Sequence, residues 1–198
     1  MTSVFLKRVV SNRRGVTIVE FAVVAAPLIF LIFGALDLAY QAYATAVVQG
    51  TTNTAGRKAT LENASATAIE NYVRSRLNGI ASGNNLHISS SNFLTYNKIG
   101  KPEKLTTDFD NDGVYDKADS DCFIDDNRNN VYDTASQGAS GIGTAEDVVR
   151  FQVTATYTRL SPIPQLIGMG NTVTISRTTF MRNEPYAGVV DPQLKCGV

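Results

Sequence analysis

The longest apolar stretch of the chain lies close to its N-terminus. Residues 16–36 read VTIVEFAVVAAPLIFLIFGAL, which is 21 residues with a single charge, that of Glu20. As an α-helix with a rise of ~1.5 Å per residue, this stretch would be roughly 31 Å long, which matches the ~30 Å hydrocarbon core of a bilayer. The pattern therefore predicts one transmembrane helix over residues 16–36.

The helical pattern continues past the apolar stretch. Apolar residues recur at roughly helical spacing among the Ala, Thr and Gln residues of 38–59, and no turn signal precedes them. We expect one long helix that leaves the membrane and continues outside it. Pro27 can kink this helix. Gly50 and Gly56 weaken it, because each costs up to about 1 kcal/mol relative to alanine.

The remaining residues predict a short helix, several strands and a loop. Ser65 is a typical N-cap, and the apolar spacing after it predicts a helix over residues 65–77. Strict alternation of apolar and polar residues, clearest from Phe151 to Tyr157, is typical of a half-buried strand. Strands are predicted over residues 86–90, 148–159 and 172–182, and the Gly/Ser-rich residues 136–145 predict a flexible loop. Together these patterns predict an α+β fold, in which the long N-terminal helix packs outside the membrane on a small, mostly antiparallel sheet.

Charge is distributed unevenly although the net charge is zero. The first 14 residues carry four basic residues and no acid, so the positive-inside rule predicts a cytoplasmic N-terminus and translocation of the rest. The predicted organisation is a leader over residues 1–15, the span over 16–36 and an exported domain over 37–198. A cleaved secretory signal peptide is the alternative, but its apolar region is usually only 7–15 residues long.

Glu20 is the one charge inside the predicted span. A carboxylate in a membrane helix costs a few kcal/mol unless it stays hydrated at the interface or finds a partner. Cleavage after Gly15 would give Val16 a positive α-amine near the membrane boundary. Glu20 could then pair with that amine on a neighbouring copy, and the charge would direct lateral assembly of the helices.

A family resemblance rests on this region. The stretch RRGVTIVEFAVVAAPLIFLIFGALDLAY resembles the N-terminus of type IVb prepilins and, more closely, of the TadE-type minor pseudopilins of tight-adherence (Flp) pilus systems. The matched features are the basic residues, Gly15, Glu20 followed by Phe21, Pro27 within the apolar run and Asp37 at its end. The similarity covers roughly residues 13–60, and residues 172–186 are a weaker echo of the C-terminal part of such proteins.

The resemblance implies a function in pilus assembly or adhesion. It implies that a prepilin peptidase cleaves between Gly15 and Val16 on the cytoplasmic side, and that Glu20 and Phe21 mediate assembly. The expected protein is a non-enzymatic minor pilin in the bacterial inner membrane, with a periplasmic domain that can reach the pilus or the cell surface. Its expected partners are the membrane, other pilins, the pilus assembly machinery and the peptidase. The alternative is a singly anchored periplasmic module that binds calcium and recognises another protein.

The calcium hypothesis comes from an acidic segment over residues 108–133, which holds nine Asp residues. Its first part, DFDNDGVYDKAD, has acids at positions 1, 3, 5, 9 and 12 of a calcium loop and glycine at position 6. The predicted Ca²⁺ ligands are Asp108, Asp110, Asp112, the Val114 carbonyl, Asp116 and Asp119. Residues 125–133 are a degenerate copy that predicts a turn or a contribution to a shared site, and a solvated loop without metal remains the alternative for both.

The remaining chemistry is sparse. The two cysteines, Cys122 and Cys196, predict one disulfide in an exported domain. The single histidine, His87, lies two residues from Ser89 in a predicted strand, which does not resemble a nucleophile elbow. No phosphate-binding, dinucleotide-binding or zinc motif is present, and no basic patch laced with aromatic residues indicates nucleic acid binding. The sequence therefore does not favour an enzyme.

Overall fold

The computed structural model describes residues 16–166, 168–185 and 191–197. Helix α2 covers Val16–Ala59 without interruption and continues through Pro27. The predicted long helix is therefore confirmed. By length and composition, α2 is the one helix in the described parts of the chain that could cross a membrane. The predicted leader, residues 1–15, lies outside the described residues.

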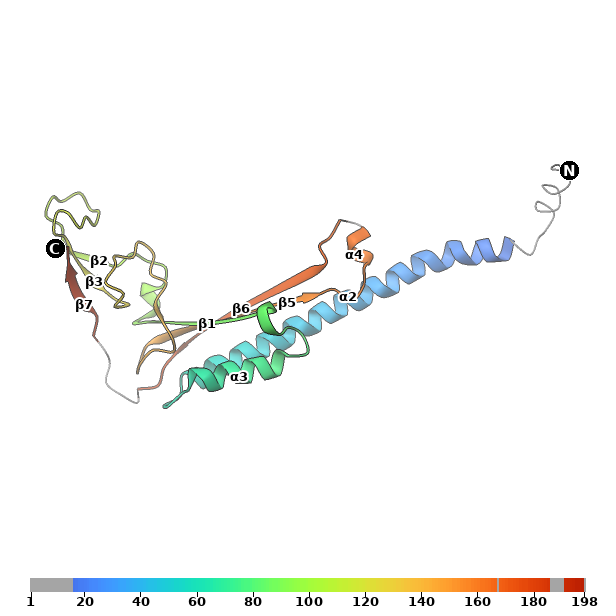
Figure 1. Cartoon of the computed structure of the whole chain (residues 1–198), viewed down its shortest axis with the longest axis horizontal. Coiled ribbons are helices and arrows are strands. Elements are labelled where there is room, and N and C mark those ends of the chain that lie inside the picture. Colours follow the sequence, from blue (N-terminus) through green and yellow to red (C-terminus); the bar gives the residue numbers. More distant parts are fainter. Residues whose placement is uncertain (1–15, 167, 186–190, 198) are drawn as a thin grey trace. The chain divides into compact units, whose positions relative to one another are not determined.

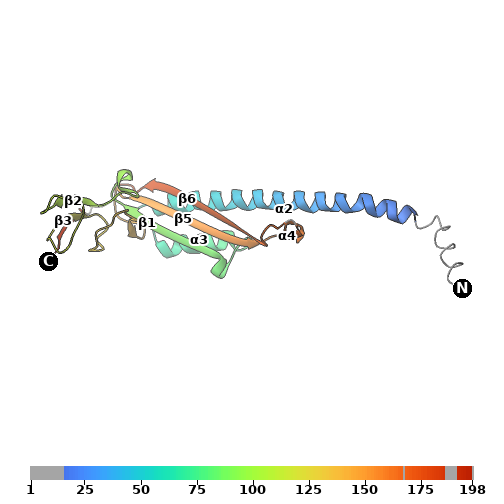
Figure 2. The same cartoon turned by 90° about the horizontal axis from the view of Figure 1, so that it is seen from above.

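The chain divides into two compact units. The first unit combines residues 1–44 with residues 158–173 and therefore holds the apolar part of α2 and the short helix α4, Ile163–Leu166. Figures 1 and 2 show α4 beside α2. The second unit, residues 45–157 and 174–198, holds the rest of α2 and most of both sheets.

A four-stranded sheet with the order β4-β1-β5-β6 forms the centre of the second unit. Its strands are β1 (Leu86–Phe93), β4 (Ala139–Ser140), β5 (Val148–Thr158) and β6 (Thr172–Arg182). β1 pairs antiparallel with both β4 and β5. Hydroxyl hydrogen bonds join Thr156 to Thr174 and Thr154 to Ser176. Residue numbers fall along β5 as they rise along β6, so the two strands are antiparallel. The predicted α+β class with antiparallel strands is confirmed.

Two helices cover one face of this sheet. The part of α2 in the second unit, residues 45–59, and helix α3 (Ala66–Leu77) run along the same side of the strands in Figures 1 and 2. Their buried residues recur at helical spacing, and β5 contributes every second residue from its half of the core. The buried set includes Val48, Thr52, Ala55, Ala59, Ile69, Val73, Leu77, Phe151, Val153 and Ala155.

Gly56 allows α2 to approach β6 closely. A Cβ atom at this position would lie 2.6 Å from Thr179 Cγ2 and 3.4 Å from Met181. The sequence suggests only that Gly56 weakens the helix, whereas the structure shows that its missing side chain makes room for the strand. At the start of α3, the Ser65 hydroxyl accepts the Ala68 N–H, as its predicted role as N-cap requires.

A second, smaller sheet lies near the acidic segment. It has the order β2-β3-β7, with β2 at Lys104–Thr107, β3 at Cys122–Asp125 and β7 at Gln193–Cys196. Both strand pairs are antiparallel. Cys122 is opposite Cys196 in the register of β3 and β7, and a disulfide joins the two residues.

The structure corrects several local expectations. Residues 136–145 were predicted to be a flexible loop, but Ala139–Ser140 pairs with β1, and Ser136 and Ala145 are buried. Strand β1 extends to Phe93 because its second half pairs with both β4 and β5. The second sheet was not predicted, since its four-residue strands are too short to show a period. Two 3₁₀ turns, Gly83–Asn85 and Tyr96–Lys98, flank β1.

Candidate functional site

The apolar part of α2 presents its side chains outward. Ile18 is 71% exposed and Phe21 is 73% exposed, and no residue of 17–36 is buried. Glu20 is also exposed on this helix, one turn after its first residue, Val16. Gly15 lies outside the described residues. This arrangement leaves the whole circumference of the segment available to lipid or to other helices.

A buried ion pair marks the end of the apolar stretch. Asp37 Oδ2 lies 2.6 Å from Arg159 Nη1, and the two side chains are 4% and 15% exposed. The guanidinium also donates through Nε to the Gly170 carbonyl at 3.0 Å. Because all three residues belong to the first unit, the ion pair attaches residues 159–170 to α2 at the point where the apolar sequence stops.

The first acidic loop brings three of the predicted ligands together. Asp108, Asp110 and Asp112 each offer a carboxylate oxygen, and these oxygens lie within 4.8 Å of one another. The loop is shaped by backbone N–H groups that donate to the same side chains: Gly113 to Asp108 at 2.9 Å, Asp112 to Asp110 at 3.2 Å and Val114 to Asp112 at 2.7 Å. Asp108 Oδ1 is buried without a hydrogen-bond partner. These three carboxylates are the kind of oxygen ligands that a hard cation such as Ca²⁺ prefers.

The same contacts shift the pKa values of two of these carboxyls in opposite directions. The hydrogen bond from the Gly113 N–H lowers the pKa of Asp108, because it stabilises the charged form. The pKa of Asp110 is raised: the hydrogen bond from the Asp112 N–H lowers it, but partial desolvation, the Asp108 side chain and the charges of Asp112 and Asp119 outweigh that bond. The loop therefore holds mutually repelling charges that a cation would stabilise.

The other predicted ligands do not belong to this three-carboxylate cluster. Asp116 Oδ1 accepts the Ala118 N–H at 2.8 Å. The Val114 side chain is 61% exposed, and Asp119 is exposed. The described cluster therefore covers the first half of the predicted calcium loop.

The second acidic loop repeats the hydrogen bonds of the first. Asp125 accepts the Asn130 N–H at 2.8 Å, Asn127 accepts the Asn129 N–H at 3.0 Å, and Asn129 accepts the Val131 N–H at 2.7 Å. These are the same three donor–acceptor pairs, shifted by 17 residues. Each loop also has positive φ at its fourth and sixth positions: 58° and 79° at Asn111 and Gly113, and 60° and 61° at Arg128 and Asn130.

Asparagines give the second loop internal donors that the first loop lacks. The side-chain amides of Asn127 and Asn129 donate to Asp133 Oδ2 at 2.6 Å and 3.2 Å. The residue equivalent to Asp133 in the first loop is Asp116, and the side chains equivalent to the two donors are the carboxylates of Asp110 and Asp112. Carboxylates cannot donate when ionised.

A buried carboxylate outside each loop links the second and ninth residues of that loop. Asp121 accepts the N–H groups of Phe109 and Asp116 at 3.0 Å and 2.9 Å, which are the second and ninth positions of the first loop. Asp121 is fully buried. A carboxylate that accepts two backbone N–H groups leaves neither group unsatisfied, so it stabilises the closed loop.

Glu103 does the same for the second loop. It accepts the N–H groups of Asp126 and Asp133 at 2.8 Å and 3.1 Å, again the second and ninth positions. Glu103 directly precedes β2 and Asp121 directly precedes β3. Because β2 and β3 are antiparallel, the carboxylate at the start of each strand lies beside the loop at the end of the other.

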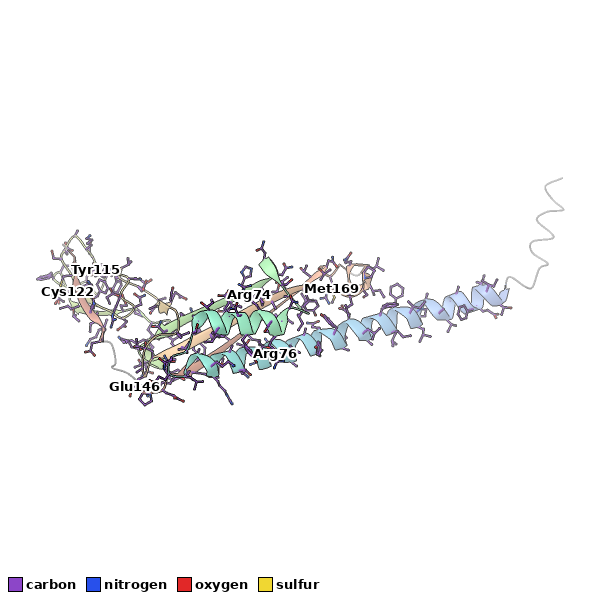
Figure 3. All side chains as sticks on the ribbon, turned by 60° about the horizontal axis from the view of Figure 1, so that its bottom comes forward. Arg74, Arg76, Tyr115, Cys122, Glu146 and Met169 are labelled. Carbon is purple, nitrogen blue, oxygen red and sulfur yellow. A yellow bond between two sulfur atoms is a disulfide. The ribbon has the colours of Figure 1, made fainter. Side chains whose placement is uncertain are left out.

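The two loops share an aromatic core. Tyr115 and Tyr132, the eighth residues of the loops, stack with ring centroids 4.8 Å apart. Phe123 of β3 meets both rings edge-on at 5.0 Å and 5.4 Å. Figure 3 shows Tyr115 close to Cys122, which is linked to Cys196 by the 2.08 Å S–S bond. We call residues 103–133 together with β7 the paired-loop module.

The sequence predicted the aspartates of the first loop but not the residues that organise the module. Glu103 and Asp121 stand outside both repeats, and no local pattern distinguishes them from surface acids. The one available signal was the repeated Val-Tyr-Asp, which the structure shows to be a complete structural repeat. His87 and Ser89, the residues considered for catalysis, are exposed on β1.

Comparison with known proteins identifies the N-terminal segment. Residues 15–57 match the family described as TadE-like protein. The predicted TadE-type resemblance is thus confirmed over the apolar part of α2 and most of its continuation. No curated protein and no solved structure matches the chain.

Proposed function

We propose, starting from this TadE-like N-terminal segment, that the chain is a minor pilin or pseudopilin of a tight-adherence (Flp-type) pilus. In this function it is a non-enzymatic subunit of pilus assembly or adhesion. It spans the bacterial inner membrane once, with a cytoplasmic N-terminus and a periplasmic domain over residues 37–198. Its partners are other pilins, the assembly machinery and a prepilin peptidase that cleaves between Gly15 and Val16.

The observation that carries this proposal is the apolar segment of α2, which has one charge and no buried side chain over residues 17–36. Side chains at 17–36 that are not buried by the chain itself need another apolar environment. Glu20 is the charged exception, and a carboxylate at this depth is stabilised when it meets a positive group. The α-amine of a processed neighbour beginning at Val16 would supply that group, so that Glu20 and Phe21 lie at the assembly contact.

Glu20→Ala tests the assembly role. We expect the variant to insert into the membrane at least as well as the native chain, because a charge is removed from the span, but to lose pilus assembly or co-assembly. Glu62→Ala, which removes an exposed acid just beyond α2, is the matched control and should keep normal piliation. Normal piliation and adhesion in Glu20→Ala would contradict the proposal.

N-terminal sequencing of the native protein separates the pilin from the alternative function. A mature chain that begins at Val16 supports processing as a pilin. A chain that still begins at Met1 supports instead a singly anchored periplasmic module that recognises another protein.

A second function, calcium binding, is favoured by the first acidic loop. The Asp108, Asp110 and Asp112 oxygens lie within 4.8 Å of one another, and Asp108 Oδ1 has no hydrogen-bond partner. Calcium would replace the mutual repulsion of these carboxylates with coordination and would hold the loop in one conformation. Calorimetric titration of the full chain in detergent tests this function, and the absence of binding at millimolar calcium would remove it.

A further inference from the structure

An uncharged loop with exposed apolar side chains connects β5 to β6. Residues 160–171 read LSPIPQLIGMGN and contain no acid and no base. Leu160 is 61% exposed, Leu166 is 72% exposed and Met169 is 53% exposed. Exposed apolar side chains that gather into one patch mark a site of contact with a protein or a membrane.

Hydrogen bonds hold the described residues of this loop, 160–166 and 168–171. Its centre is the helix α4, and the Met169 N–H donates to the Pro164 carbonyl at 2.9 Å. At its base the Arg159 N–H donates to the Asn171 carbonyl at 2.9 Å. Pro164 and Ser161 are buried, so the loop has an inner side, and Leu160, Leu166 and Met169 remain outside it. Their exposure is therefore a property of the folded loop.

The ion pair described above fixes this loop at the end of the apolar segment. Arg159, the residue before the loop, binds Asp37, and Asp37 directly follows Leu36, the last residue of the apolar run. Figures 1 and 2 show α4 beside α2, and all of these residues belong to one compact unit. Asp37 is one residue past Leu36, which is a rise of only ~1.5 Å along the helix. The base of the loop, at Arg159, therefore lies within one helical turn of the end of the apolar run.

That position corresponds to the lipid headgroups if residues 16–36 span the bilayer. The headgroup regions add roughly 5–8 Å to each side of the ~30 Å hydrocarbon core, and apolar side chains are stabilised where this region meets the acyl chains. The absence of charge over residues 160–171 favours lipid as the occupant, because no formal charge has to be desolvated.

We propose that Leu160, Leu166 and Met169 form a second membrane contact and enter the headgroup region beside α2. The inference rests on the proposed membrane anchoring of residues 16–36 and adds a lipid-binding surface outside the TadE-like segment. The buried Asp37–Arg159 pair is the link that holds this surface at the height of the membrane boundary.

Depth-dependent quenching in nanodiscs tests the proposal. The full chain is placed in phosphatidylethanolamine–phosphatidylglycerol nanodiscs and carries one dye-labelled cysteine, since both native cysteines are in the disulfide. Met169→Cys (Figure 3) probes the loop, Ile29→Cys probes the span, and Leu61→Cys probes an exposed leucine in the other unit. We expect headgroup-labelled quencher lipids to quench the dye at 169, acyl-chain quenchers to quench it at 29, and neither to reach it at 61.

The three positions distinguish the possible failures. Quenching at 29 without quenching at 169 would overturn the loop contact and leave the anchoring intact. Absence of quenching at 29 would overturn the anchoring and the loop contact with it.

A double variant supplies the second arm. Leu160→Asp with Leu166→Asp should abolish headgroup quenching of the dye at 169, because charged side chains favour water over this region. Leu61→Asp is the matched control and should leave that quenching unchanged. Because all three leucines are exposed, the fold should tolerate the substitutions. Undiminished quenching in the double variant would contradict the role of these leucines.

Discussion

The two loops of the paired-loop module have the same backbone but different internal chemistry. Both follow a short strand, both are tied by a buried carboxylate, and their tyrosines stack on one another. In the first loop, carboxylates occupy the third and fifth positions. In the second loop, Asn127 and Asn129 occupy these positions and donate to Asp133. The same loop backbone is therefore compatible with two different sets of internal contacts.

The difference predicts different dependence on a cation. Asp108, Asp110 and Asp112 place like charges close together, so the first loop gains stability from a bound cation. The second loop replaces two of those charges with amide donors and is internally hydrogen-bonded without any ion. We therefore expect the first loop to respond to calcium and the second to act as a constant scaffold for it.

Breaking the disulfide should disturb both loops at once and give the largest effect. Cys122 begins the strand β3 that joins the loops, and its partner Cys196 is 74 residues away. Removing a cross-link over such a loop costs about 4 kcal/mol in the chain-entropy model. Cys122→Ser with Cys196→Ser should lower hydrogen-exchange protection at Gly113 and Asn130 alike. Reduced native chain is the control and should match the variant; loss of protection at one loop alone would show that the loops are independent.

Giving the second loop the acids of the first should make it dependent on calcium. Asn127→Asp with Asn129→Asp removes both donors to Asp133 and adds two charges. Without calcium we expect a local loss of about 3 kcal/mol, since hydrogen bonds to charged groups contribute about 1.5–3 kcal/mol each. Hydrogen exchange at Asn130 measures this loss, and millimolar calcium should restore the protection.

The matched control for the double substitution to aspartate is Asn127→Ala with Asn129→Ala. It removes the same donors but adds no ligands, so calcium should not restore its protection. Equal recovery of the Ala and Asp variants in calcium would show that the effect does not come from coordination.

The converse substitution, asparagine for aspartate in the first loop, should weaken calcium binding. Asp110→Asn with Asp112→Asn removes two of the three clustered charges, and we expect the affinity for calcium to fall at least tenfold, or about 1.4 kcal/mol. Calorimetry of the full chain measures the affinity, and Glu62→Gln serves as a charge control distant in sequence. The new amides should also protect the calcium-free loop by donating to Asp116. An unchanged affinity would mean that calcium binds elsewhere.

The sequence was most informative where structure depends on local pattern. The apolar run of α2 and the alternation in β5 each contain their own periodicity, so their residues predict their structure without knowledge of neighbours. The aspartates of the first loop likewise form a local pattern, because Asp108, Asp110 and Asp112 are two residues apart and belong to the same loop. In each case the residues that interact lie within a few positions of one another.

It was least informative where distant residues meet. The link between Glu103 and the loop that ends at Asp133, 30 residues away, depends on the antiparallel pairing of β2 and β3. The pairing of Arg159 with Asp37 joins residues 122 apart, and β4 exists only because β1 offers it an edge. No local period encodes such contacts, because they are set by the register of the folded strands.

Replacing Glu103 should give the smallest and most local effect, at the second loop. Burial raises the pKa of this carboxyl above its ordinary 4.5, although the N–H groups of Asp133 and Asp126 oppose the shift. The folded module therefore binds a proton at a pH where the unfolded chain has released it. Stability falls as the pH rises from 4.5 through the raised folded pKa. Glu103→Gln should abolish this slope.

The same substitution should cost about 1 kcal/mol at neutral pH, because an amide has one oxygen where two backbone N–H groups need acceptors. Denaturation of the full chain at several pH values measures both effects, and hydrogen exchange should locate the loss at the second loop. Asp121→Asn, the matched change on the other side, should place it at the first loop, since Asp121 binds Phe109 and Asp116. Equal loss of protection in both loops for either variant would contradict this expectation. It would mean that each carboxylate stabilises the whole module and not one loop.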